Sequence, residues 1–107
     1  MIVSGGENIY PAEVQSALYG HPAIGDVAMI GVPDERWGEA VKAIVVLRPA
    51  QSASATTIVA YARKRIAGYK LPKSIDFVDH LQRNPSGKIL KRELRERYWR
   101  GQKRRVH

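Results

Sequence analysis

Two apolar runs in the first half of the chain constrain its fold more than any other feature. Residues 27–32 (VAMIGV) are apolar at both alternating sets of positions, and a second apolar, β-branched run follows at 41–47 (VKAIVVL). A strand that is apolar on both sides is typical of a sheet covered on both faces. The polar connection 33–39 predicts that the two runs pair as an antiparallel hairpin with a long loop.

Shorter elements on either side of this hairpin supply the covering layers. Gly and Pro residues separate them, and apolar residues at helical spacing indicate each helix. In chain order β-α-β-β-α-β-α, the expected elements are a strand at 1–3, a helix at 11–19, strands at 27–32 and 41–47, a helix at 58–66, a strand at 75–78 and a helix at 90–98. This order predicts a small sandwich of the α/β (α+β) class, with an approximately three-stranded sheet flanked by helices.

Size and composition exclude several classes of protein. The length of 107 residues allows one domain with a small core, and the absence of cysteine excludes disulfides, thiolate catalysis and Cys-based zinc sites. The three histidines are too scattered to predict a metal site: His21, His80 and His107. No apolar stretch reaches the ~20 residues of a transmembrane helix, and the first residues lack the basic start of a secretory signal. We expect a cytoplasmic protein without a transmembrane segment, for which a peripheral membrane contact stays open.

The positive charge lies entirely in the last quarter of the chain. The formal net charge is +8, but residues 1–82 hold eight basic and eight acidic side chains, whereas residues 83–107 hold ten basic and two acidic ones. A basic segment fits a nucleic-acid-binding module, yet no aromatic-interleaved surface or recognition-helix pattern accompanies it. We therefore expect no nucleic-acid partner, and we expect residues 100–107 to form a disordered basic tail.

A Gly-rich segment near the start is more polar than packing requires. Residues 4–11 read SGGENIYP, and adjacent glycines allow a positive φ and the close approach of a ligand to the backbone. The alternative is a plain turn between a strand and a helix.

A second polar segment holds a lysine on a tight turn. Residues 84–88 (NPSGK) place Lys88 where it can act as a fixed positive charge for a phosphate or a carboxylate; the alternative is a solvated lysine on an ordinary turn. A nucleoside-triphosphatase phosphate loop is excluded, because Gln82 stands at its first Gly and Ile89 at its Mg²⁺-binding hydroxyl. A third polar segment, residues 34–39 (DERWGE), we expect to be mainly structural.

These segments occur in one order, as MIVSGGENIYPAEV, VAMIGVPDERWGEAVKAIVVL and YKLPKSIDFVDHLQRNPSGKILKRELR. Read together, they resemble the C-terminal domain of the AMP-forming acyl-CoA ligases, and most of all the bacterial fatty-acyl-CoA ligases. The resemblance covers residues 1–99 and implies a mobile lid domain that rotates between two half-reactions. It further implies an N-terminal adenylation core in the same polypeptide as partner, with ATP, Mg²⁺ and coenzyme A as ligands of the full-length enzyme. We expect this domain alone to bind none of them firmly and to be inactive.

The resemblance also assigns roles to particular residues. It implies that Lys88 is the adenylation lysine, oriented by the turn residues Asn84, Pro85, Ser86 and Gly87. It implies that a loop lines the pantetheine tunnel in the second half-reaction, formed by Ser4, Gly5, Gly6 and Glu7. Candidate contacts to the phosphates of coenzyme A, against which solvated helix-face side chains are the alternative, are Arg63, Lys64, Lys70 and Lys73.

Two other functions stay open at this point. One is the nucleic-acid-binding module, and the other is a free-standing interaction domain that regulates a separate ligase. The resemblance implies that the acid pocket lies in the core domain, so the chain does not encode the length of the acyl group. The intact Gly-Gly loop favours a CoA ligase over an acyl-AMP ligase.

Overall fold

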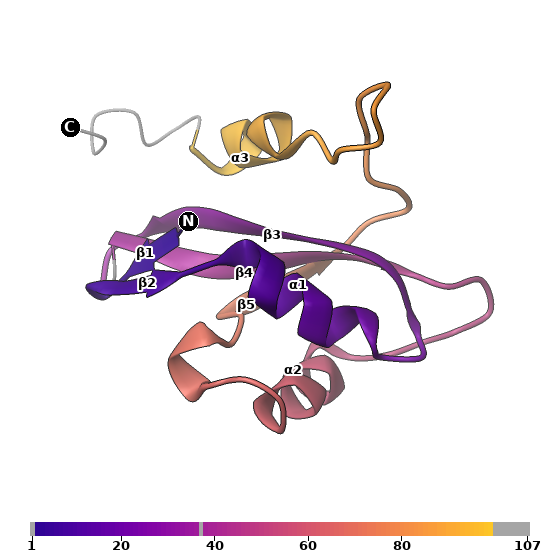
Figure 1. Cartoon of the computed structure of the whole chain (residues 1–107), viewed down its shortest axis with the longest axis horizontal. Coiled ribbons are helices and arrows are strands. Elements are labelled where there is room, and N and C mark those ends of the chain that lie inside the picture. Colours follow the sequence, from indigo (N-terminus) through magenta and orange to yellow (C-terminus); the bar gives the residue numbers. More distant parts are fainter. Residues whose placement is uncertain (1, 37, 100–107) are drawn as a thin grey trace.

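The computed structural model describes residues 2–36 and 38–99. Within these residues a five-stranded sheet carries helices on both faces (Figure 1). The elements are β1 (Ile2–Ser4), β2 (Glu7–Ile9), α1 (Pro11–Tyr19), β3 (Ile24–Asp34), β4 (Gly38–Leu47), α2 (Ala55–Arg63), the 3-10 turn η1 (Gly68–Lys70), β5 (Ser74–Phe77) and α3 (Lys91–Trp99). Residues 100–107, expected to be a disordered tail, lie outside the described residues, as does Trp37 of the third polar segment.

The long antiparallel hairpin of β3 and β4 forms the centre of the sheet. Its pairing runs from Ile24 opposite Leu47 to Asp34 opposite Gly38. The hairpin is confirmed, but the expected long loop is wrong, because within the polar connection β3 continues to Asp34 and β4 already begins at Gly38. Backbone pairing does not require apolar side chains, so the polarity of these residues did not mark the end of the strands.

The fold class is confirmed, with more strands than the approximately three expected. Strand β4 pairs with β3 on one side and with both β1 and the parallel strand β5 on the other. Strand β2 adds to β1 through the two-residue turn Gly5-Gly6, in a register that places Ser4 opposite Glu7. The sequence Glu7–Ile9 has little strand character of its own, so the turn and the neighbouring strand decide its conformation.

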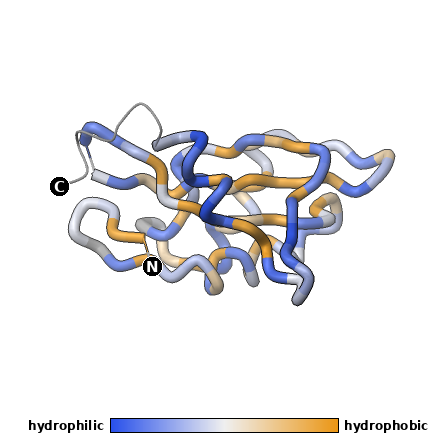
Figure 2. The backbone as a smooth tube through the Cα atoms, turned by 90° about the horizontal axis from the view of Figure 1, so that it is seen from above, coloured by the Kyte–Doolittle hydropathy of each residue, from blue (hydrophilic) through white to orange (hydrophobic). Residues whose placement is uncertain are grey.

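Each face of the sheet has its own apolar core, and hydrophobic residues run along the strands between them (Figure 2). On one face α1 and α2 cover the larger core, which includes Val14, Leu18, Ile58 and Ala62. On the other face α3 covers a smaller core with two partly buried side chains, Leu94 and Tyr98. Leu90, the first residue of the helix predicted at 90–98, is not part of that core in the described structure and lines a surface hollow instead.

Local capping signals predict the starts of α1 and α2 better than the spacing of apolar residues does. Helix α1 begins at Pro11, as expected from the preset φ of proline. Helix α2 begins three positions before the predicted start, because Ser54 and Thr57 form a reciprocal capping box. No helix in the described part of the chain combines the length and the apolar character needed to cross a membrane.

Candidate functional site

The Gly5-Gly6 turn is built by backbone conformation. Both glycines have positive φ, 59° and 85°, which is the pattern of a type I′ turn. A Cβ on Gly6 would meet no described atom within 4 Å, so packing inside this chain does not require a glycine there. Ser4 is buried and pairs with Gly38 of β4, which fixes one arm of the turn to the sheet. The turn thus presents bare backbone on a rigid support.

The turn that carries Lys88 is organised by one side chain. Oδ1 of Asn84 accepts hydrogen bonds from the backbone N–H of Ser86 at 3.0 Å, from the Ser86 hydroxyl at 2.8 Å and from the backbone N–H of Lys88 at 3.0 Å. The Gly87 N–H donates to the Asn84 carbonyl at 2.9 Å, closing a four-residue turn with Pro85 at its second position. All four predicted turn residues therefore lie together with the lysine.

The Lys88 ammonium takes no part in this internal hydrogen bonding among the described residues. Its side chain is exposed, and among residues 2–36 and 38–99 none accepts a hydrogen bond from it or forms an ion pair with it. The backbone on either side is paired, since Asn84 N–H donates to the Lys88 carbonyl at 2.8 Å and Arg83 bridges to Ile89. The arrangement presents a charge from an ordered base.

Arg83 connects the Lys88 turn to the sheet. One guanidinium nitrogen donates to the Gly87 carbonyl at 2.8 Å, and the other donates to the Asp26 carboxylate on β3 at 2.6 Å. Asp26 also accepts a hydrogen bond from the Tyr19 hydroxyl at 2.6 Å. Burial and the bond to Asp26 raise the pKa of Tyr19, and Asp26 raises the pKa of Arg83. At neutral pH the tyrosine therefore keeps its proton and the arginine its charge.

No pattern in the sequence predicts this network. Arg83 and Asp26 lie 57 positions apart, and Tyr19 is the last residue of helix α1. A polar residue at the edge of an apolar strand was the one available signal for Asp26, and it did not indicate a partner. Only the packing of α1 against β3 brings Tyr19 and Asp26 together.

Helix α3 is held behind the Lys88 turn by polar contacts as well as by its apolar side chains. The Tyr98 hydroxyl donates to Asp76 on β5 at 2.5 Å, and Lys42 on β4 lies 3.1 Å from the other Asp76 oxygen. Burial and the Asp76 bond raise the pKa of Tyr98 to about 12, while the Tyr98 bond and then Lys42 lower the pKa of Asp76. The Trp99 indole N–H donates to the Gly31 carbonyl at 2.8 Å.

The two predicted site loops do not lie together. In Figure 1 the β1–β2 turn lies at one end of the sheet, and the turn before α3 lies at the other end of the molecule. The four basic candidates for coenzyme A also divide. Arg63 and Lys73 line one hollow of about 360 Å³ between α2 and β5. Lys64, at the C-cap of α2, and Lys70, which lies 2.7 Å from Glu13, are not among the described residues that line it.

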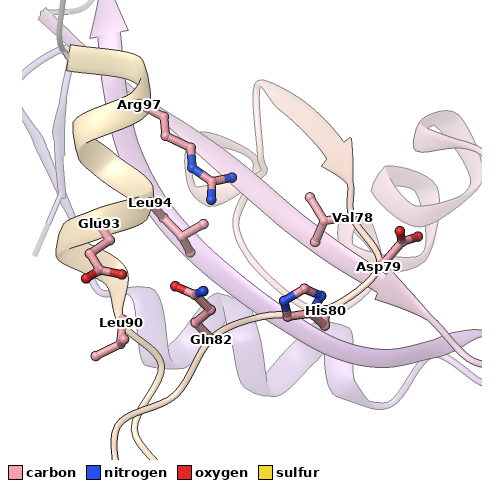
Figure 3. A pocket seen from close by; sticks show the side chains of 8 residues that line it. All are labelled: Val78, Asp79, His80, Gln82, Leu90, Glu93, Leu94 and Arg97. Atoms are coloured by element: carbon pink, nitrogen blue, oxygen red, sulfur yellow. The ribbon is translucent and has the colours of Figure 1, made fainter.

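A further hollow, of about 260 Å³, lies between α3 and the segment that follows β5. Arg97 and Leu94 extend from the helix toward Gln82 and His80 on that segment (Figure 3). Side chains of both charge signs line it, and no group of three His, Cys, Asp or Glu residues able to hold a metal ion occurs in the described part of the chain. The residues that line this hollow do not indicate a particular ligand.

Comparison with known proteins identifies the family. Residues 13–88 match the family described as the AMP-binding enzyme C-terminal domain. The chain is 54% identical over 98 residues to a feruloyl-CoA synthase of Amycolatopsis sp, covering 92% of this chain and 20% of that protein. It is 53% identical to a long-chain-fatty-acid–CoA ligase of Mycobacterium tuberculosis over 98 residues, or 92% of this chain and 19% of that ligase.

A solved structure supports the same family assignment. The fold matches a Mycobacterium tuberculosis fatty acyl CoA synthetase with a TM-score of 0.87 and 51% identity, over 94% of this chain and 20% of that one. The chain thus spans about a fifth of the length of the relatives it matches. The resemblance found from the three sequence segments is confirmed, and the chain belongs to the family of AMP-binding enzyme C-terminal domains.

Proposed function

We propose that this chain serves as the C-terminal domain of an AMP-forming acyl-CoA ligase. In the first half-reaction a carboxylate attacks the α-phosphate of ATP to give acyl-AMP and pyrophosphate. In the second, the thiol of coenzyme A attacks the acyl-AMP to give the thioester and AMP. The observation that supports this proposal most is Lys88, an exposed ammonium on an ordered turn with no ion-pair partner among the described residues.

Lys88 suits the first half-reaction. Negative charge increases around the α-phosphate when the carboxylate attacks, and a preorganised ammonium stabilises that charge without first reorganising. It also holds two anions close together that otherwise repel one another. The turn from Asn84 to Gly87 fixes where the lysine begins, which limits the entropy lost when the ammonium enters a site.

The Gly5-Gly6 turn suits the second half-reaction. A narrow thiol arm needs walls without side chains, and the open space beside Gly6 leaves room for it. Because the two turns lie at opposite ends of the molecule, one active site meets them one at a time, which favours a rotation of this domain between the steps (Figure 1). Arg63 and Lys73, which share a hollow, are the stronger pair of candidates for the phosphates of coenzyme A.

The proposal assigns a partner and a setting to the domain. The partner is an N-terminal adenylation core that holds the acid, the ATP and its Mg²⁺, and the domain alone is inactive. The substrate is a carboxylic acid, with a fatty acid as the first candidate. Cytoplasmic location and the absence of a nucleic-acid partner stay predictions.

The test uses the polypeptide in which this chain is joined to its adenylation core. Pyrophosphate–ATP exchange measures the first half-reaction, and release of AMP from supplied acyl-AMP and coenzyme A measures the second. Fatty acids and cinnamic-type acids form the substrate panel. We expect Lys88→Ala to slow exchange by about 10²- to 10³-fold and to leave thioester formation unchanged.

Arg92→Ala is the matched control, because it removes another exposed cation close to the same turn. Equal loss of both half-reactions in the Lys88 variant, or none in either, would contradict the assignment. Exchange in the absence of any carboxylic acid would argue against a ligase.

A further inference from the structure

Within the described residues, the Lys88 turn is ordered by its own hydrogen bonds and is joined to the sheet by one ion pair, from Arg83 to Asp26. Within the described residues, the polar contacts of residues 83–88 stay inside 82–90, except for those of the Arg83 guanidinium. That guanidinium reaches Asp26 at 2.6 Å. On the flanks of the turn, the buried Leu81 belongs to the smaller core and the half-buried Ile89 packs against it.

The Arg83 guanidinium uses its two arms for two different tasks. One arm donates to the carbonyl of Gly87, the residue directly before Lys88, at 2.8 Å. The other arm holds a carboxylate on β3, the longest strand. A planar guanidinium places its donors in a fixed geometry, so the position of the Gly87 carbonyl becomes tied to the position of β3.

Asp26 is itself fixed, which makes it a firm anchor. Its Oδ1 accepts the Tyr19 hydroxyl at 2.6 Å and the backbone N–H of Val27 at 3.0 Å, while Oδ2 accepts Arg83. Tyr19 is the last residue of α1 and also donates to the Val27 carbonyl at 3.3 Å. The anchor therefore joins a helix, a strand and the lysine turn.

We propose that Arg83 and Asp26 are positioning residues for Lys88, which clamp its turn to the sheet so that the ammonium enters the adenylation site in one orientation. This inference rests on the proposed function. In this role Arg83 contacts no reacting atom, and it affects the reaction only through the position of Lys88. Positioning matters because a displacement of about 1 Å at a reacting centre lowers a rate by roughly a hundredfold.

The experiment compares Arg83→Met with Arg95→Met in the ligase polypeptide. The two arginines are well matched: their side chains are 40% and 48% exposed, and the carboxylates that they pair with, Asp26 and Glu39, are 19% and 22% exposed. Arg95 makes no hydrogen bond to the Lys88 turn in the described structure. We expect Arg83→Met to lower kcat for exchange by about ten- to a hundredfold, with KM for ATP and thioester formation unchanged.

Further variants separate positioning from general stability. Asp26→Asn should lower exchange by about three- to tenfold, and Arg83→Lys should recover part of the rate because an ammonium reaches one acceptor at a time. In a Lys88→Ala background, Arg83→Met should cost nothing more, since a positioning residue has no effect once the residue it positions is gone. Amide hydrogen exchange at residues 84–88 should be faster in Arg83→Met than in Arg95→Met.

Each outcome supports or overturns the clamp. Equal effects of Arg83→Met and Arg95→Met, parallel loss of both half-reactions, or a full additional loss in the Lys88→Ala background would overturn it. Faster amide exchange with an unchanged adenylation rate would also overturn it, while Lys88→Ala would still report on the proposed function. If Lys88→Ala itself spares adenylation, the proposed function fails and the positioning role fails with it.

Discussion

The Gly5-Gly6 turn and the Lys88 turn are both short and polar, but different interactions hold them. The first is a two-residue reversal between paired strands, set by two positive φ angles. The second depends on side chains: Asn84 orders it from within and Arg83 ties it to β3. A wall for a thiol arm needs backbone without side chains, whereas a charge that enters another domain needs a side chain on an ordered base. The two turns should therefore fail under different substitutions.

Among the substitutions that test how each turn is held, the largest effect is expected at the backbone-built turn. Gly5→Leu adds a side chain at φ 59° and should slow thioester formation by about a hundredfold, while acyl-AMP formation stays within a few-fold of the parent. The strain should lower the free energy of unfolding by about 1–2 kcal/mol. The two half-reaction assays and thermal unfolding of the ligase polypeptide measure these effects.

Gly87→Leu is the matched control, because it makes the same substitution in the other turn. Gly87 has φ 88° and open space for a Cβ, so the strain is comparable, but it lies in the Lys88 turn. This variant should impair adenylation instead. Normal thioester synthesis by Gly5→Leu would refute the tunnel role, and identical kinetic defects in the two variants would remove the distinction between the turns.

A smaller effect is expected when the side-chain-built turn loses its organiser. Asn84→Ala removes the acceptor of three hydrogen bonds and should slow adenylation by about tenfold, with thioester formation unchanged. Asn84→Asp keeps an acceptor oxygen and should preserve most of the rate. If both variants behave like the parent in pyrophosphate exchange, the turn orders itself without this side chain.

The smallest effect is expected at the anchor of α3, which belongs to neither turn. Tyr98→Phe removes the hydroxyl bonded to Asp76 and should lower the free energy of unfolding by about 1 kcal/mol, measured by urea titration. Both half-reactions should change equally. A selective loss of adenylation would show that α3 takes part in placing Lys88, contrary to the clamp at Arg83.

The contacts of Asp76 with Tyr98 and Lys42 predict that the stability of the fold depends on pH. The fold holds the pKa of Asp76 below its ordinary value of 3.8, so the folded chain binds that proton more weakly than the unfolded chain. The stabilisation is present above about pH 4 and is lost as the pH falls through the lower, folded pKa. The free energy of unfolding should fall less in Asp76→Asn than in the parent over this acid range. An equal fall in the two proteins would contradict the lowered pKa of Asp76.

How much of each turn could be predicted from the sequence also depends on which interactions hold that turn. The Gly-Gly turn was recognisable because glycine itself permits the conformation, and the Asn-Pro-Ser-Gly turn because its bonds join neighbours in the chain. The attachment of the Lys88 turn was not recognisable, because Arg83 meets Asp26 across 57 positions. The four basic candidates could not be sorted either, since folding places Arg63 beside Lys73 and pairs Lys70 with Glu13.

The amino-acid sequence alone determined the central hairpin, the helix start at Pro11, the two turns and the family. These features depend on residues close together in the chain or on residue types in a specific order. Tertiary structure alone decided the short strand at Glu7–Ile9, the two cores on opposite faces of the sheet, and the Tyr19–Asp26–Arg83 network. The two cores and the bond from Arg83 to Asp26 need partners from distant segments of the chain, and the strand Glu7–Ile9 needs its pairing with β1. Side-chain hydrogen bonds of this kind depend on distances that only the packed sheet and helices set.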